Sequence, residues 1–186
     1  MATRKNQHRR TRGARTTRRR SQSNRRSSRT RRQPDAIAVL REDHARVIEM
    51  FGRFGAMRGN ERKEKLTEQI CDELEVHTQI EEEIFYPAVR EAIGETDLID
   101  EALVEHQSAK ELISQIRAMR ADEALYDARV TVLGEYVKHH VKEEQGEIFP
   151  KARRAGLDLV ELGERMRTRK GEIASGMLGK LKRILS

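Results

Sequence analysis

The chain has 186 residues, which suffices for one domain of ordinary size with tails and for a core without disulfide staples. It is 37% charged and 4% aromatic, lacks Trp and is rich in Ala, Glu, Leu and Arg, a composition that favours helices. The single cysteine, Cys71, excludes an internal disulfide framework and a cysteine zinc finger, and we expect it to be a small buried side chain.

No run of residues approaches the roughly 18 apolar residues of a membrane span. The Arg-rich start is not followed by the apolar core of a secretory signal. We therefore expect a soluble, cytoplasmic protein. An organelle transit peptide is the alternative interpretation of this start, and the lack of an apolar face argues against it.

The first 33 residues differ in charge from the rest of the chain. Residues 1–33 hold 13 Arg and one Lys without an acidic residue, whereas the remainder holds 24 Lys and Arg against 31 Asp and Glu. This basic N-terminal tail has no apolar stretch that a core could bury, so we expect it to be disordered in the absence of a binding partner. It lacks aromatic residues between its basic ones, so we expect at most sequence-independent, salt-sensitive contact with nucleic acid. A merely solvated extension is the alternative.

After Pro34-Asp35 the apolar residues recur at helical steps of three and four. Asn60 and Asp122 are expected to cap the second and the fourth helix, and Gly156 to end the fourth. Short connections between long amphipathic helices predict an all-α domain over residues 34–156, an antiparallel up-down-up-down four-helix bundle. The helices are expected at about 35–56, 61–92, 97–120 and 123–154.

Residues 157–186 form a basic and loosely amphipathic segment. Three interpretations stay open for it, in this order of preference: a helix that docks on the bundle, a frayed tail, and a weak membrane-surface segment.

Each expected helix carries a histidine where its period requires an apolar residue, and two helices add a glutamate one turn later. The i to i+4 spacing places each glutamate on the same face as its histidine. A single core histidine is more often satisfied locally, but two carboxylates and four imidazoles in one core cost several kcal/mol per ion without compensation. The set therefore predicts a metal site formed by His44, His77, Glu81, His106, His140 and Glu144.

The two halves of the domain also repeat each other. Segments 77–87 and 140–150 align without a gap, each with a glutamate four residues and a proline ten residues after its histidine. This repeat predicts approximate two-fold symmetry and two metal ions bridged by the two glutamates. It also selects His140 over His139, which lies about 100° round the helix and is expected to be solvated or to lie behind the ligands. Imidazole with carboxylate suits Fe, Mn or Zn, and the lack of thiolate argues against Fe–S clusters.

These residues resemble the hemerythrin family, specifically its HHE cation-binding branch, over about residues 35–155. The resemblance implies a non-haem di-iron centre with a bridging oxide or hydroxide, the four histidines as terminal ligands, and Glu81 and Glu144 as bridges. It also implies a role in responding to or reacting with oxygen, hydrogen peroxide or nitric oxide, or in storing and delivering iron for Fe–S repair. With the Arg-rich tail, a nucleic-acid-associated redox sensor is a further alternative.

One position departs from the oxygen-carrying members of this family. They have a fifth histidine one turn after the third-helix histidine, and this chain has Lys110 there. The departure predicts a site that reacts rather than one that carries oxygen, with an ammonium that attracts anions unless its stem carries it out to solvent. The sequence offers no nucleophile with a paired base, no Gly-rich phosphate loop and no dinucleotide fingerprint, so hydrolase and kinase interpretations have no support, and turnover of any substrate stays open.

Overall fold

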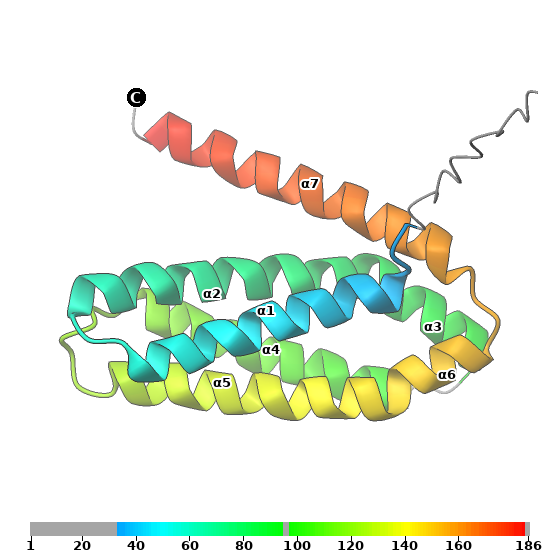
Figure 1. Cartoon of the computed structure of the whole chain (residues 1–186), viewed down its shortest axis with the longest axis horizontal. Coiled ribbons are helices and arrows are strands. Elements are labelled where there is room, and N and C mark those ends of the chain that lie inside the picture. The colour runs from blue at the N-terminus through cyan, green and yellow to red at the C-terminus, as the bar shows by residue number, and fades with distance from the viewer. Residues whose placement is uncertain (1–32, 95–96, 185–186) are drawn as a thin grey trace, which may run out of the picture. The chain divides into compact units, whose positions relative to one another are not determined.

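A computed structural model describes residues 33–94 and 97–184 of the chain, with side chains as far as Gly176. The expectations for residues 1–32, including the disordered tail, lie outside the described residues. No strand occurs among the described residues, so the prediction of an all-helical bundle is confirmed (Figure 1). The helices are α1 (Ala36–Ala56), α2 (Asn60–Ile80), η1 (Glu81–Phe85), α3 (Tyr86–Ile93), α4 (Asp97–Arg117), α5 (Tyr126–Glu143), η2 (Glu144–Ile148), α6 (Phe149–Arg154) and α7 (Leu159–Ile184).

Helices α1, α2, α4 and α5 surround one interior, because α1 packs on α2 and α5 while α4 packs on α5 and α2 (Figure 1). The apolar stripes of these helices fill that interior in two clusters. One cluster includes Phe51, Ile70 and Leu133, and the other includes Ile37 and Phe85. Along α1, α2 and α4 the predicted histidine falls between residues of the two clusters, so a polar layer separates two apolar ones.

Two helix starts differ from the sequence prediction. Asn60 is the first residue of α2, and Gly59 holds the cap position with φ +93 and no side-chain hydrogen bond. Asp122 does not cap a helix, since residues 118–125 form bends and turns and the next helix, α5, begins at Tyr126. There the Arg120 N–H donates to the Glu123 side chain at 2.7 Å, a local hydrogen bond that favours the turn over an earlier helix start.

The predicted helices 61–92 and 123–154 are each interrupted by one π-helical turn. The Tyr86 N–H donates to the Glu81 carbonyl, five residues back, and the Phe149 N–H likewise donates to Glu144. Pro87 and Pro150 follow directly, and a proline has no N–H and crowds the carbonyl four residues before it. The expectation of unbroken helices is therefore wrong at the two turns that begin with the candidate glutamate ligands.

Helix α7 packs on α1 and α2. Leu162 and Met166 are buried in the cluster that contains Ile37. A Cβ on Gly163 would lie 2.7 Å from the Pro34 carbonyl oxygen, so glycine permits the close crossing over the start of α1. Among the three interpretations of this segment, these contacts support a docking helix. No described helix is both long enough and apolar enough to cross a membrane.

Candidate metal centre

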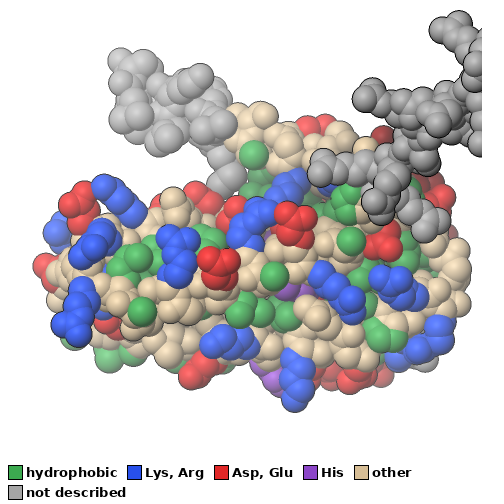
Figure 2. All heavy atoms as spheres, viewed as in Figure 1, with side chains coloured by type: hydrophobic (Ala, Val, Ile, Leu, Met, Phe, Trp, Pro, Cys, Tyr) green, Lys and Arg blue, Asp and Glu red, His purple; other side chains and the backbone are tan. Residues whose placement is uncertain are grey.

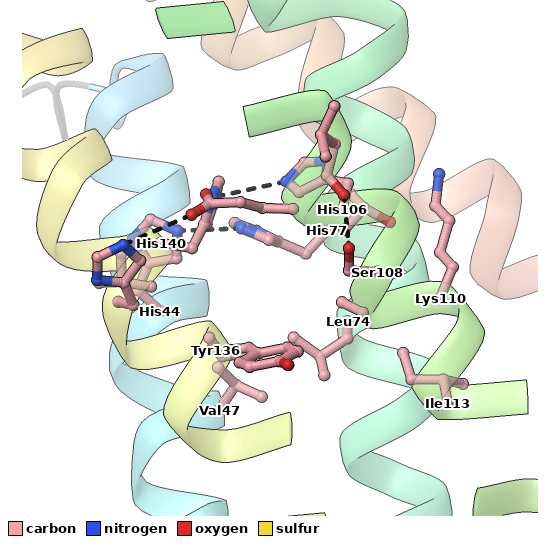
Figure 3. A pocket seen from close by; sticks show the side chains of 17 residues that line it. His44, Val47, Leu74, His77, His106, Ser108, Lys110, Ile113, Tyr136 and His140 are labelled. Atoms are coloured by element: carbon pink, nitrogen blue, oxygen red, sulfur yellow. Dashed lines mark hydrogen bonds and ion pairs between the residues drawn. The ribbon is translucent and has the colours of Figure 1, made fainter. Parts of the chain in front are cut away.

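The six predicted ligands all lie in the polar layer between the two apolar clusters. Glu81 and Glu144 are fully buried, and none of the four histidines is more than 8% exposed. Figure 3 shows His44, His77, His106 and His140 converging from separate helices. Cys71 is buried outside this layer, and burial raises the pKa of its thiol to about 12, as expected for a small core side chain that does not react.

The ligand atoms form two groups that share one glutamate. In the first, which we call position 1, His44 Nε2 lies 3.0 Å from His77 Nε2, and His77 Nε2 lies 3.2 Å from Glu81 Oε2. In the second, position 2, His106 Nε2 lies 3.4 Å from both His140 Nε2 and Glu81 Oε2. Glu144 Oε2 lies 3.2 Å from His44 Nε2. Glu81 thus lies between the two groups, and Glu144 lies beside position 1.

These separations fit metal ions. Ligand atoms at right angles around an ion, with bonds of about 2.1 Å, lie about 3 Å apart. The four carboxylate oxygens of Glu81 and Glu144 are buried without a hydrogen bond from the described residues. A cation between them would compensate this buried charge. The donor set, imidazole with carboxylate, suits iron, manganese or zinc.

The pKa shifts reflect the same crowding of charge. Burial and the nearby His77 lower the pKa of His44 to about 3. Burial and the charge of Glu81 raise the pKa of Glu144 well above its usual value. Burial disfavours the charged form of Glu81 too, but His77 and His106 outweigh it and lower its pKa. Without a bound cation the layer cannot hold all its groups in their ligand forms at once.

Behind position 2, both histidines meet carboxylates. His106 Nδ1 lies 2.9 Å from Glu82 Oε1, and His140 Nδ1 lies 2.8 Å from Glu105 Oε2. The Lys110 Nζ donates to both oxygens of Glu82 at 2.7 Å, so it shares Glu82 Oε1 with His106 Nδ1 and lies behind that ring. The His139 side chain is 63% exposed and lies 3.2 Å from Glu143, in line with the prediction that it is solvated.

Sequence reasoning missed Tyr86. Its hydroxyl lies 3.5 Å from the Nε2 atoms of both His106 and His140. The π-helical turn places it there, because the hydrogen bond to Glu81 puts Tyr86 one wide turn on from that ligand. In a regular α-helix the five-residue separation would place Glu81 and Tyr86 on different faces. The signal available in the sequence was the proline that follows Tyr86.

A cavity of about 260 Å³ opens onto the four histidines. At its outer side, Val104 is 67% exposed and Tyr136 is 52% exposed. The cavity therefore links the buried layer to the surface through mainly apolar walls. These walls include Val47, Leu74, Ala109, Ile113, Val137 and Val141.

Residues 35–152 match the model of the hemerythrin HHE cation binding domain. The chain belongs to this family. It is 32% identical over 111 residues to a DNA nickase of Nostoc sp. (strain PCC 7120 / SAG 25.82 / UTEX 2576), a match that covers 60% of this chain and 31% of that protein. The chain thus spans about a third of that relative.

The fold is similar to the crystal structure of an HHE cation binding domain-containing protein, the Rv2633c homolog from Mycobacterium kansasii. The TM-score is 0.70 at 25% sequence identity, over 80% of this chain and 93% of the other. The resemblance inferred from the histidine and glutamate pattern is confirmed at the level of the family.

Proposed function

We propose that the chain binds two iron ions in positions 1 and 2 and reacts with a small oxidant or gas, namely oxygen, hydrogen peroxide or nitric oxide. The observation that carries this proposal is the pair of three-residue donor groups that share the buried carboxylate of Glu81. When bound, ferrous iron supplies the electrons for reduction of such a molecule. His44, His77, His106, His140, Glu81 and Glu144 would hold the metals.

The residues around the site suit a small uncharged molecule. The apolar walls of the cavity favour its entry over that of ions. The Lys110 ammonium is held by Glu82, so we no longer expect it to attract anions to the metals. The Tyr86 hydroxyl is buried, and burial with the nearby Glu81 raises its pKa well above the usual value, which keeps its proton on the oxygen. It is therefore a hydrogen-bond donor at position 2.

Air cycling of the iron-loaded protein tests this function. We expect two irons per chain by metal analysis, and an absorption spectrum that changes on exposure to air or peroxide and does not return when the oxygen is removed. Tyr86→Phe should keep its iron, but that iron should oxidise roughly tenfold more slowly, because the variant lacks one hydrogen-bond donor at position 2. Full return of the ferrous spectrum through several cycles would show an oxygen carrier and contradict the proposal.

A second candidate function is non-specific nucleic-acid contact through residues 1–33. The supporting observations are the 14 basic residues there without an acidic one and a relative named DNA nickase. On the face in Figure 2, basic and acidic side chains are interspersed, so the coloured residues offer no broad basic surface there.

We expect the whole chain to bind duplex DNA and deletion of residues 1–33 to abolish the binding. By counterion release, about six phosphate contacts give a slope near roughly −5 in a plot of log affinity against log salt concentration. Fluorescence anisotropy at several salt concentrations measures this slope. Binding that survives the deletion, or none by either form at low salt, would remove this candidate.

A further inference from the structure

The internal repeat aligns the two halves of the site, but two pairs of residues break the symmetry. Glu82, which follows the ligand Glu81, corresponds to Gln145, which follows Glu144. Tyr86 corresponds to Phe149, whose ring stacks on His44 with centroids 6.0 Å apart. A carboxylate and a hydroxyl near position 2 therefore correspond to an amide and a phenyl ring near position 1.

The two metal positions differ most in what lies behind their histidines. At position 2 both Nδ1 atoms meet carboxylate oxygens, at 2.9 Å for His106 and 2.8 Å for His140. An imidazole that binds a metal through Nε2 keeps its proton on Nδ1. A carboxylate that accepts this proton fixes the ring and makes it a stronger ligand. Both rings of position 2 are held in this way.

Within residues 33–94 and 97–176, neither ring of position 1 has an equivalent partner. His77 Nδ1 lies 3.7 Å from Asp43 Oδ2, beyond hydrogen-bond distance, and both atoms are buried without a hydrogen bond from the described residues. The other oxygen of Asp43 accepts from Lys170, a residue of α7. Glu82 also accepts from a lysine, Lys110, so the two carboxylates differ in their distance from the ring and not in having a cation beside them.

The second ring, His44, faces an amide. Its Nδ1 lies 3.3 Å from Gln145 Nε2, and two N–H groups cannot share one hydrogen bond. With a metal on His44 Nε2, the Gln145 amide must therefore turn its oxygen toward Nδ1. Even then a neutral oxygen accepts the proton less strongly than a carboxylate does.

From these contacts we infer that the two positions are inequivalent: position 2 fills first and retains its metal, and position 1 holds the exchangeable one. This inference rests on the proposed dinuclear site. A ligating histidine that lacks its hydrogen-bond partner typically lowers the metal affinity of the site by about 10- to 100-fold. Glu81 is common to both positions, so it does not decide between them. Glu144 adds a carboxylate beside position 1 alone and so opposes this order. The inference gives more weight to the support of the rings: Glu82 and Glu105 hold both rings of position 2, whereas an amide and a more distant carboxylate, Gln145 and Asp43, lie behind those of position 1.

Gln145→Glu and Glu82→Gln test the inference, because each gives one half of the site the partner of the other half. Metal-free full-length protein is titrated with Co²⁺ alone in a calorimeter, and crystals loaded with one equivalent are measured by anomalous diffraction. For the wild type we expect two dissociation constants at least about tenfold apart, with the first equivalent at His106 and His140. Gln107→Glu is the control, since it adds the same charge next to His106 in the sequence. Gln107 is exposed, and in the wild type its amide donates to Glu111.

Gln145→Glu should tighten the weaker step and leave the tighter one unchanged, whereas Glu82→Gln should weaken the tighter step. The control should change neither by more than about threefold. Two equal steps in the wild type, or a first equivalent at His44 and His77, would overturn the inference and leave the dinuclear site standing. Failure to bind Co²⁺ or iron at all would overturn the dinuclear proposal together with it.

Discussion

Glu81→Ala should reduce the bound metal from two ions per chain to well below one. Glu81 belongs to both groups of ligand atoms, so its loss leaves position 2 with two imidazoles and position 1 without the shared carboxylate, with Glu144 as its one remaining anion. Two neutral ligands on separate helices bind a divalent ion far more weakly than a set with an anionic bridge. Metal analysis after gel filtration measures the content.

Glu144→Ala should have a smaller effect. The Glu144 oxygen lies 3.2 Å from His44 Nε2, beside position 1, so position 2 keeps its three ligands and about one metal ion should remain. This refines the sequence-based expectation that the two glutamates act as equal bridges. Equal metal content in the two alanine variants would contradict this assignment.

His139→Ala is the control for helix α5. Its side chain is largely exposed and lies outside both buried groups. With Glu105 and Glu143 it forms a third group of possible donors, but His139 and Glu143 are exposed there, so we expect the metal content to stay at that of the wild type. His140→Ala removes a ligand of position 2 and should lower the metal content. The opposite result, with metal lost from the His139 variant alone, would mean that the repeat selected the wrong histidine.

The helices and the six ligand candidates could be predicted from the sequence because each depends on a short-range period. His77 and Glu81, for example, are four residues apart and share a face whatever their neighbours do. The internal repeat then distinguished His140 from His139, which an apolar period alone does not do. The prediction of continuous α-helices was wrong at Glu81 and Glu144, where a π-helical turn begins before Pro87 and Pro150.

The carboxylates that contact the histidine Nδ1 atoms could not be predicted from the sequence period. Glu82 reaches His106 and Glu105 reaches His140 across helix interfaces, and such contacts depend on how the helices pack. Lys170 lies 127 positions from its partner Asp43, so only the docking of α7 brings the two together. The sequence-based account of Lys110 likewise lacked Glu82, the group that binds its ammonium.

Removing the metals should lower the melting temperature of the protein by roughly 5–10 °C. An ion present at a hundred times its dissociation constant stabilises the folded state by about 2.7 kcal/mol, and in a domain of this size 1 kcal/mol shifts the midpoint by about 2–4 °C. The burial of the two carboxylates is the reason why we expect metal removal to destabilise the fold. Without cations, the oxygens of Glu81 and Glu144 lie buried among the four imidazoles without a hydrogen bond from the described residues.

Differential scanning calorimetry of chelator-treated and iron-reloaded protein measures the shift, and Glu81→Ala provides the control. Because that variant should bind little metal, the chelator should leave its melting temperature unchanged. A protonated Glu144 relieves part of the repulsion in the metal-free protein, since burial and the charge of Glu81 already favour its neutral form. The shift in melting temperature is therefore smaller than it would be if Glu81 and Glu144 were both ionised in the metal-free protein. Equal melting temperatures for the two forms of the wild type would mean that the polar layer is stable on its own, and the stabilising role of the metals would then be wrong.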